Sequence, residues 1–360
     1  MKTSIYKSGL LLLLALTFTG LSLEAQEVSK EYHKEYSTND NTTLSINNKY
    51  GDVVVSTWDR NSIVIDVKVT ILLPNRDRAE KLLSYIDVRF SEDGDNISAR
   101  TIIDDKNFSF TGWGNTSRRF SIDYTVSMPE GTDLAVTNRY GDTELGEHSG
   151  KISLDIKYGD LKAEELSRGN VKPLSYLNIA YGKADINEAG WLDVTARYSG
   201  SMRIGKSQAL LLDSRYSKLN LEETSSVVAD SKYDNIRIGT INNLVIECGY
   251  ADIVIGTLNK KLVFDGEYGS FTIEEIPEDF EDLEVKTRYT GVRLGIDDDA
   301  TYKLDASLSY GDLRFDSERF RHKRQIIENT SKEYSGIMGD DEDPAASVRI
   351  SSSYGTVRLE

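Results

Sequence analysis

The residues that could act as nucleophiles, bases or metal ligands are few and lie far apart. His33, His148 and His322 stand in separate polar segments, without a local His-x-x-His spacing or cysteine partners, so we expect surface histidines and no metal site. Cys248 is the only cysteine, which excludes an internal disulfide. The sequence contains no nucleophile elbow, phosphate-binding glycine loop or zinc-protease helix. It therefore predicts neither a catalytic residue nor a cofactor.

Carboxylates are the remaining candidates for chemistry, because a pair of them can hydrolyse a glycosidic bond. In this sequence, however, acidic residues recur two positions before basic ones. Such pairs are Asp155 with Lys157, Asp213 with Arg215 and Asp230 with Lys232. On the outer face of a strand they would form solvated salt bridges, each contributing less than ~1 kcal/mol. The pattern favours a protein that is not an enzyme, with a carbohydrate-active enzyme as the least favoured alternative.

Tyrosine has the most regular spacing of any residue type in this chain. Marker tyrosines follow one another at short and nearly constant steps, and one more closes the series near the C-terminus. The markers are Tyr140, Tyr158, Tyr181, Tyr198, Tyr216, Tyr233, Tyr250, Tyr268, Tyr289, Tyr310 and Tyr354. They share a face with the apolar residues two and four positions earlier, so we predict a stacked structural ladder with its rings inside. A surface strip that binds glycans is the alternative.

A repeated phrase surrounds each marker. In residues 244–255, Leu244 and Ile246 alternate with polar neighbours up to Tyr250, and Ile253 resumes the alternation after a short corner. Alternation on both sides of a polar corner indicates strand, corner and strand. The period is shorter than a propeller blade or a helical repeat. We therefore predict an all-β protein, a single-stranded parallel β-solenoid (β-helix) with 17–21-residue coils; an antiparallel sandwich is the main alternative.

Cys248 stands two positions before its marker tyrosine. Small residues hold the equivalent position in neighbouring coils, namely Ala196, Ser214, Ser231, Gly266 and Thr287. We therefore expect Cys248 to be buried and unreactive, because a free cysteine at such a position behaves as a small apolar side chain.

Residues 1–25 have the features of a secretory signal peptide: a basic start, an apolar run over 10–18 and a small residue before Gln26. The run is too short to span a membrane, so we predict no transmembrane segment and an exported protein in the periplasm, at the outer surface or outside the cell. Removing two lysines and one glutamate with this segment changes the net charge from −16 to −17. Such a charge repels nucleic acid and anionic lipid.

The remaining chain divides where the rhythm of the phrase changes. The predicted parts are a flexible lead-in over 26–43, a β-rich cap with the first coil over 44–131, and the solenoid over 132–360. A short helix is expected over about 76–84, following Pro74. A charged loop is expected over about 317–346, and residues 348–359 should form the last coil. A cap is needed because an open terminal coil exposes unpaired backbone groups.

One stretch outside the repeat resembles a binding loop. Phe108, Phe110 and Trp113 stand among glycine, serine, threonine and asparagine, a composition typical of recognition loops. These three residues are the candidate binding site for a partner. The alternative is a hairpin whose rings pack on the cap.

The phrases Asn48-Lys-Tyr-Gly-Asp, Tyr124-Thr-Val-Ser-Met-Pro-Glu-Gly-Thr-Asp and Asn138-Arg-Tyr-Gly-Asp resemble the family named putative adhesin, which comprises bacterial β-strand-repeat proteins similar to the head domains of auto-transporter adhesins. The resemblance covers about residues 40–360. It implies a binding role at the bacterial envelope toward a glycan or protein ligand, and it assigns no catalytic residue. A structural or regulatory envelope component linked to a signalling system remains the second reading.

Overall fold

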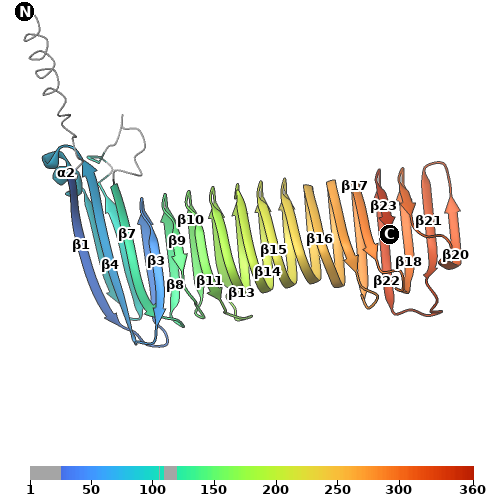
Figure 1. The fold of residues 1–360 in the computed structure, drawn as a ribbon, viewed down its shortest axis with the longest axis horizontal. Coiled ribbons are helices and arrows are strands. Elements are labelled where there is room, and N and C mark those ends of the chain that lie inside the picture. The colour runs from blue at the N-terminus through green and yellow to red at the C-terminus, as the bar shows by residue number, and fades with distance from the viewer. Residues whose placement is uncertain (1–25, 105, 109–119) are drawn as a thin grey trace, which may run out of the picture.

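The chain forms an elongated, almost entirely β structure, seen from the side in Figure 1. The computed structural model describes residues 26–104, 106–108 and 120–360. In these residues 23 strands belong to one sheet, and the single helix is α2 (Arg76–Leu83). The predictions of an all-β fold and of a short helix near 76–84 are confirmed. No helix in the described ranges is long and apolar enough to cross a membrane.

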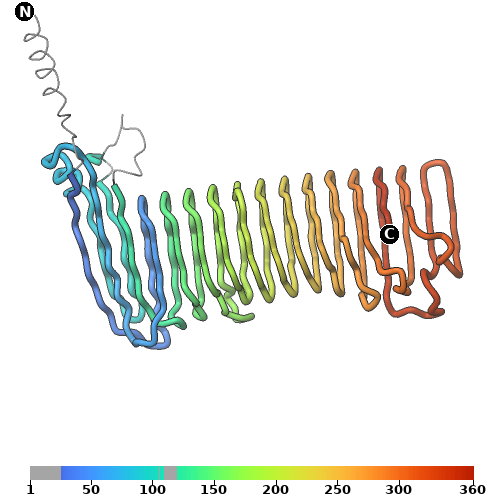
Figure 2. Tube along the Cα trace, viewed as in Figure 1, coloured from blue at the N-terminus to red at the C-terminus, as the bar shows by residue number. Residues whose placement is uncertain are grey.

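The central part of the chain consists of turns that lie side by side and pair in parallel (Figure 2). Its strands are β8 (Asp133–Arg139), β9 (Thr143–Leu145), β10 (Ile152–Lys157), β11 (Leu161–Leu166), β12 (Ser175–Ala180), β13 (Lys183–Arg197), β14 (Ser201–Arg215), β15 (Lys218–Lys232), β16 (Asn235–Ile276) and β17 (Asp282–Ile296). Equivalent residues of neighbouring turns are paired: Val194 lies beside Leu212, and Leu212 lies beside Ala229. Identical phrases therefore stack with like residue beside like.

Each turn has one strand segment before its tyrosine and one after it, and both point alternate side chains inward. Leu210 and Leu212 of β14, before Tyr216, are buried, and so are Leu219 and Leu221 of β15, after it. Together with the inward residues of other turns they form one continuous apolar core. Burying a leucine side chain fully contributes about 1.5–3 kcal/mol relative to leaving it exposed. The repeated alternation is thus the main source of stability.

The N-terminal part adds a first turn and a cover. Its strands are β1 (Gln26–Ser37), β2 (Thr43–Lys49), β3 (Val53–Trp58), β4 (Ser62–Leu73), β5 (Ile86–Asp93), β6 (Asn96–Ile103) and β7 (Phe120–Pro129). β2 pairs in parallel with β8, and β3 with β9, although β4 to β7 and the helix lie between them in sequence. β1, β4 and β7 pair antiparallel, and α2 contacts β1 and β4. Residues 26–37, expected as a flexible lead-in, form strand β1.

The C-terminal part departs from sequence order. Its strands are β18 (Tyr302–Ser309), β19 (Asp312–Arg314), β20 (Phe320–Ile327), β21 (Ser331–Met338), β22 (Ala346–Ser353) and β23 (Thr356–Leu359). β22 pairs in parallel with β17 on one side and with β18 on the other. The turn predicted to be last is therefore inserted before the turn of β18 and β19.

The segment expected as a charged loop contains the hairpin of β20 and β21. β21 pairs antiparallel with β18, which places Tyr334 beside Ala306. Tyr334 is buried and lies against Phe315, with 5.5 Å between ring centroids. The repeat phrase is a requirement of parallel stacking only, so an antiparallel hairpin forms here without it.

Candidate binding surface

Twelve tyrosines form one continuous row along the molecule, which we call the tyrosine file: Tyr50 and the eleven marker tyrosines. Their backbone φ angles lie between 52° and 68°, in the left-handed region. This conformation costs a non-glycine residue roughly 1–2 kcal/mol. It also breaks the alternation at the tyrosine and turns the side chain outward.

The prediction that the rings lie inside is therefore wrong. The eleven marker tyrosines are between 38% and 61% exposed. Period-two counting assigned them to the inner face, but that counting holds only while the backbone stays extended. The single left-handed residue at each corner reverses the assignment.

The rings of the file stack face to face on their neighbours. Centroids of successive rings are 4.7–5.2 Å apart and their planes are within 1–13° of parallel. This step is set by the spacing of neighbouring strands, about 4.7–4.9 Å. A stacked aromatic pair contributes about 0.5–1.5 kcal/mol, which offsets the strained backbone. Ring faces are thereby covered, while ring edges and hydroxyls face solvent.

The glycine and aspartate that follow many of these tyrosines connect adjacent turns, the glycine by close backbone contact and the aspartate by a hydrogen bond. A Cβ on Gly159 would lie only 1.9 Å from the carbonyl oxygen of Gly141, so the two backbones approach as closely as glycine permits. The Asp142 carboxylate accepts a hydrogen bond from the backbone N–H of Asp160 at 2.8 Å, and Asp52 accepts one from Asp142 at 2.8 Å. The Tyr-Gly-Asp motif is thus a corner that hydrogen-bonds to the next corner.

Substitutions at Tyr198 separate backbone strain from ring stacking. We expect Tyr198→Ala to lower the free energy of unfolding by about 1–3 kcal/mol, because two stacked contacts are lost while the strain remains. Tyr198→Gly loses the same contacts but relieves the strain, so it should be more stable than the alanine variant by about 1 kcal/mol. Urea unfolding of both proteins measures the difference. An alanine variant as stable as the glycine variant would refute the strain argument.

The file continues at its N-terminal end into phenylalanine side chains. Phe120 lies 5.1 Å from Tyr50, and Phe108 lies 5.2 Å from Phe120 in an edge-to-face contact. Phe108 is half-buried and packs against the core, so this predicted binding residue is at least partly structural. The other two predicted binding residues, Phe110 and Trp113, lie outside the described residues.

A hollow of about 380 Å³ lies where the file meets Phe120. Tyr50, Tyr140 and Phe120 form its aromatic side. Its polar side contains Asp52 and Asp123, and Ser121 Oγ donates to the Asp123 carboxylate at 2.7 Å. Aromatic rings beside carboxylates can contact both the C–H and the O–H groups of a polyol.

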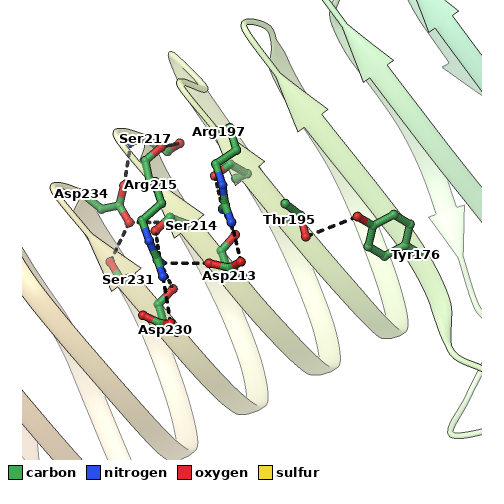
Figure 3. Close-up of polar contacts among 11 residues, drawn as sticks. Tyr176, Thr195, Arg197, Asp213, Ser214, Arg215, Ser217, Asp230, Ser231 and Asp234 are labelled. Atoms are coloured by element: carbon green, nitrogen blue, oxygen red, sulfur yellow. Dashed lines mark hydrogen bonds and ion pairs between the residues drawn. The ribbon is translucent and has the colours of Figure 1, made fainter.

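Charged side chains border the file on the outer surface of the preceding strands. Figure 3 shows Arg197 bound to the Asp213 carboxylate, and Arg215 between Asp213 and Asp230. The Arg215 guanidinium lies 2.9 Å from Asp213 and 2.8 Å from Asp230. Acidic and basic residues therefore neutralise one another both within a strand, as the predicted i, i+2 pair of Asp213 and Arg215 does, and between turns, as Arg197 with Asp213 and Arg215 with Asp230 do.

A buried carboxylate in the same region was missed by the sequence reasoning. Asp234 follows Tyr233, where many turns have glycine, and it is only 5% exposed. Its carboxylate accepts hydrogen bonds from Ser231 Oγ at 2.6 Å, from the Ser217 backbone N–H at 2.7 Å, and from Ser214 Oγ (Figure 3). The sequence did contain a signal for this carboxylate: an aspartate stands at the position where other turns have glycine, and the serines Ser214 and Ser231 occupy equivalent positions in the two turns. These contacts join two adjacent turns.

Cys248 is buried, as predicted, with 8% of its surface exposed. Burial raises the pKa of its thiol to about 12, and the charges of Asp265, Glu247 and Asp234 act in the same direction. Because the thiolate is the reactive form, we expect a thiol reagent at pH 8 to label the native protein very slowly and the urea-unfolded protein within minutes. Rapid labelling of the native protein would contradict this placement.

The histidines stay far apart, but one of them is not at the surface. His33 and His322 are exposed, whereas His148 is only 2% exposed, so its predicted surface position is wrong. Burial lowers the pKa of His148 to about 4. Within the described ranges, no three His, Cys, Asp or Glu side chains are grouped as a metal site would require.

Comparisons with known proteins find several solved structures of low similarity to this chain. No protein-family profile matches the chain, and no curated protein matches it. One similar structure is described as a putative cell adhesion protein from Clostridium sporogenes, with 11% identity over 92% of this chain and 99% of that chain, at a TM-score of 0.22. A second, from Parabacteroides distasonis, is described as a putative lipid binding protein, with 12% identity over 72% of this chain and 93% of that chain, at a TM-score of 0.30. A third, also from Parabacteroides distasonis, is described as a putative adhesin, with 11% identity over 74% of this chain and 93% of that chain, at a TM-score of 0.29. At these values none of them assigns a family or a function to this chain.

Proposed function

We propose that this chain is an exported, non-catalytic β-solenoid of the bacterial envelope that binds an external ligand through the tyrosine file. The continuous parallel registers between successive turns support a single-stranded solenoid. The basic start and apolar run of residues 1–25 support export. The solenoid serves as a rigid rod that presents one aromatic edge.

The observation that carries the proposal is the exposure of the file. Glycine or asparagine would occupy a left-handed corner with less strain, yet tyrosine stands there in twelve turns. Extended exposed apolar surface on a soluble protein marks an interaction site. Stacking explains why the rings are ordered, and binding explains why so large an aromatic surface is kept at the outer edge.

The titratable groups favour binding over catalysis. Among the residues that the structure describes, the large pKa shifts belong to Tyr124, His148, Cys248 and Tyr302, and burial is the largest cause of each. All four side chains are part of the interior rather than of a surface cleft. In catalytic sites such shifts instead occur at groups gathered in an accessible pocket. The alternatives are a structural or regulatory envelope component and, third, a carbohydrate-active enzyme.

A capture experiment with matched variants tests the proposal. The mature chain from Gln26 would be immobilised and exposed to solubilised bacterial envelope, beside a variant in which Tyr181, Tyr198 and Tyr216 are replaced by asparagine. Asparagine tolerates the left-handed conformation, so the corners should remain intact. We expect the variant to lose the captured material.

The control replaces an equal number of exposed apolar residues elsewhere. Val228, Val245 and Val263 are 41–50% exposed, and Val228 and Val245 lie side by side on adjacent turns. Their replacement by threonine, which keeps the β-branched shape, should leave capture unchanged. Equal capture by the asparagine variant, or no capture by the wild type, would overturn the proposal.

A further inference from the structure

Building on the proposed function, we infer that the tyrosine file binds an extended, neutral β-1,4-linked polysaccharide that lies along it with one sugar opposite each ring. Three properties of the file point to this ligand class. They are the chemical groups that it exposes, the repeat distance between them, and the charge around them.

The exposed groups are phenol hydroxyls and ring edges. Each inner ring of the file has both faces covered by its neighbours, so face-on stacking of a sugar or a base is blocked there. None of the twelve hydroxyls forms a hydrogen bond to a side chain or backbone group in the parts of the chain that the structure describes. A hydroxyl both donates and accepts. The file is therefore a row of unused hydrogen-bonding groups suited to a ligand rich in hydroxyls.

The repeat distance selects the type of polymer. Successive rings are separated by 4.7–5.2 Å, so the twelve of them span roughly 55 Å. A peptide strand places side chains of one face about 6.6–6.8 Å apart and loses register within about three rings. Stacked bases advance by about 3.4 Å and also lose register. The sugar repeat of an extended β-1,4-linked pyranose chain is close to the ring spacing, and its equatorial hydroxyls project sideways from every residue.

In the middle of the file, the surrounding charges favour a neutral chain. Arg197 and Arg215, which directly precede their tyrosines, are engaged by Asp213 and Asp230. On the other side of the corner, exposed carboxylates such as Asp142 and Asp160 follow. The whole chain carries −16, which repels a polyanion. A neutral polymer meets no such penalty.

The hollow beside Phe120 extends the file at one end. Asp52 and Asp142, which line it, have exposed carboxylates that can accept hydrogen bonds from sugar hydroxyls. Tyr50 and Phe120 are tilted by 56°, so the regular stack ends at this point. The end of the polysaccharide would lie in this hollow.

Chain length provides a sharp test because the contacts are weak and repeated. Calorimetric titration of the full mature chain with cello-oligosaccharides of two to eight sugars should show affinity rising with length, by at least about tenfold from four sugars to eight. Malto-oligosaccharides contain the same glucose units in a curled chain and should bind at least about tenfold more weakly. Length-independent binding, or equal binding of both series, would overturn the inference.

Hydroxyl deletion tests the surface itself. The variant with Tyr181, Tyr198, Tyr216 and Tyr233 replaced by phenylalanine keeps the stacked rings and removes four hydroxyls, and it should bind the eight-sugar ligand at least about tenfold more weakly at an unchanged melting temperature. The control Tyr302→Phe changes a buried ring outside the file and should bind as the wild type does. Unchanged affinity in the fourfold variant would overturn the inference.

The capture and titration experiments together separate this inference from the proposed function. If envelope material is captured through the tyrosines but no β-1,4-linked oligosaccharide binds, the inference fails and the binding function stands. If the protein prefers polygalacturonate or a protein ligand to the β-1,4-linked oligosaccharides, the inference likewise fails and the binding function stands. If neither sugars nor envelope material bind, both are wrong.

Discussion

Replacing Gly159 by alanine is expected to lower the free energy of unfolding by about 3–5 kcal/mol, among the largest effects of any single substitution in this chain. The new Cβ would lie 1.9 Å from the carbonyl oxygen of Gly141 and 2.7 Å from its carbonyl carbon. Both contacts are with backbone, so no side chain can move aside. The two turns would have to separate, which lengthens the hydrogen bond between Asp160 and Asp142 and weakens the tyrosine stack beside it.

Gly200 is the matched control for this prediction. It also lies in a tyrosine corner, but a Cβ there meets no atom within 4 Å and its φ is not in the left-handed region. Gly200→Ala should therefore be neutral or stabilising by about 0.4–1 kcal/mol, because alanine reduces the conformational entropy of the unfolded chain. Urea unfolding with unchanged m-values measures both. Similar losses in the two variants would show that close approach of the turns is not the cause.

The second large effect is a loss of stability on acidification that depends on His148. This residue is only 2% exposed, and its Nε2 lacks a hydrogen-bond partner in the described part of the chain. Burial lowers its pKa to about 4 from the ordinary 6.5, although Asp133, Glu130 and a backbone contact with Thr132 act the other way. The histidine is thus held neutral in the folded protein.

The sign follows from proton uptake. Between pH 6.5 and pH 4 the unfolded chain binds a proton at His148 that the folded chain does not, so the free energy of unfolding falls as the pH falls through this window. A pKa depression of this size corresponds to about 3 kcal/mol in the free energy of unfolding, and this contribution is fully lost below pH 4. Carboxylates also titrate in this range, so the contribution must be isolated by comparison with a variant.

His148→Leu removes the titrating group and should lose about 3 kcal/mol less stability between pH 7 and pH 4 than the wild type does. Denaturant unfolding at a series of pH values measures the difference, whatever the absolute stability of the variant. His322→Gln is the control, because this side chain is exposed and forms no ion pair within the described residues. It should retain the wild-type pH dependence. Parallel pH profiles for His148→Leu and wild type would show that His148 is not held neutral by burial.

Local patterns in the sequence were sufficient to predict much of the fold. Alternation in the phrase of Leu244 and Ile246 identified strands and their buried sides, because successive side chains of an extended chain point to opposite faces. The same reasoning correctly predicted that Cys248 is buried. Pro74 and the residues after it predicted the helix, whose N-cap is Asn75. These features depend only on neighbours within a few residues.

The candidate site was predicted only in part, because its geometry depends on contacts between turns. Tyrosine has no intrinsic preference for the left-handed conformation, so no local pattern indicated that Tyr198 would turn outward. The conformation is stabilised by rings of two other turns, Tyr181 and Tyr216. Likewise, Phe108 was recognised as aromatic, but its contact with Phe120 at the end of the file is a tertiary arrangement.

The order of the turns was also decided by tertiary structure alone. Tyr354 stacks between Tyr289 and Tyr310, although it follows both in sequence. Any turn that carries the phrase can pair in register with any other, because the parallel ladder and the stacked rings are the same at every interface. The sequence by itself therefore determined what each turn looks like. Which turns become neighbours, and hence where the exposed aromatic row runs, was determined by the packing of the complete chain, since identical local patterns cannot rank their possible partners.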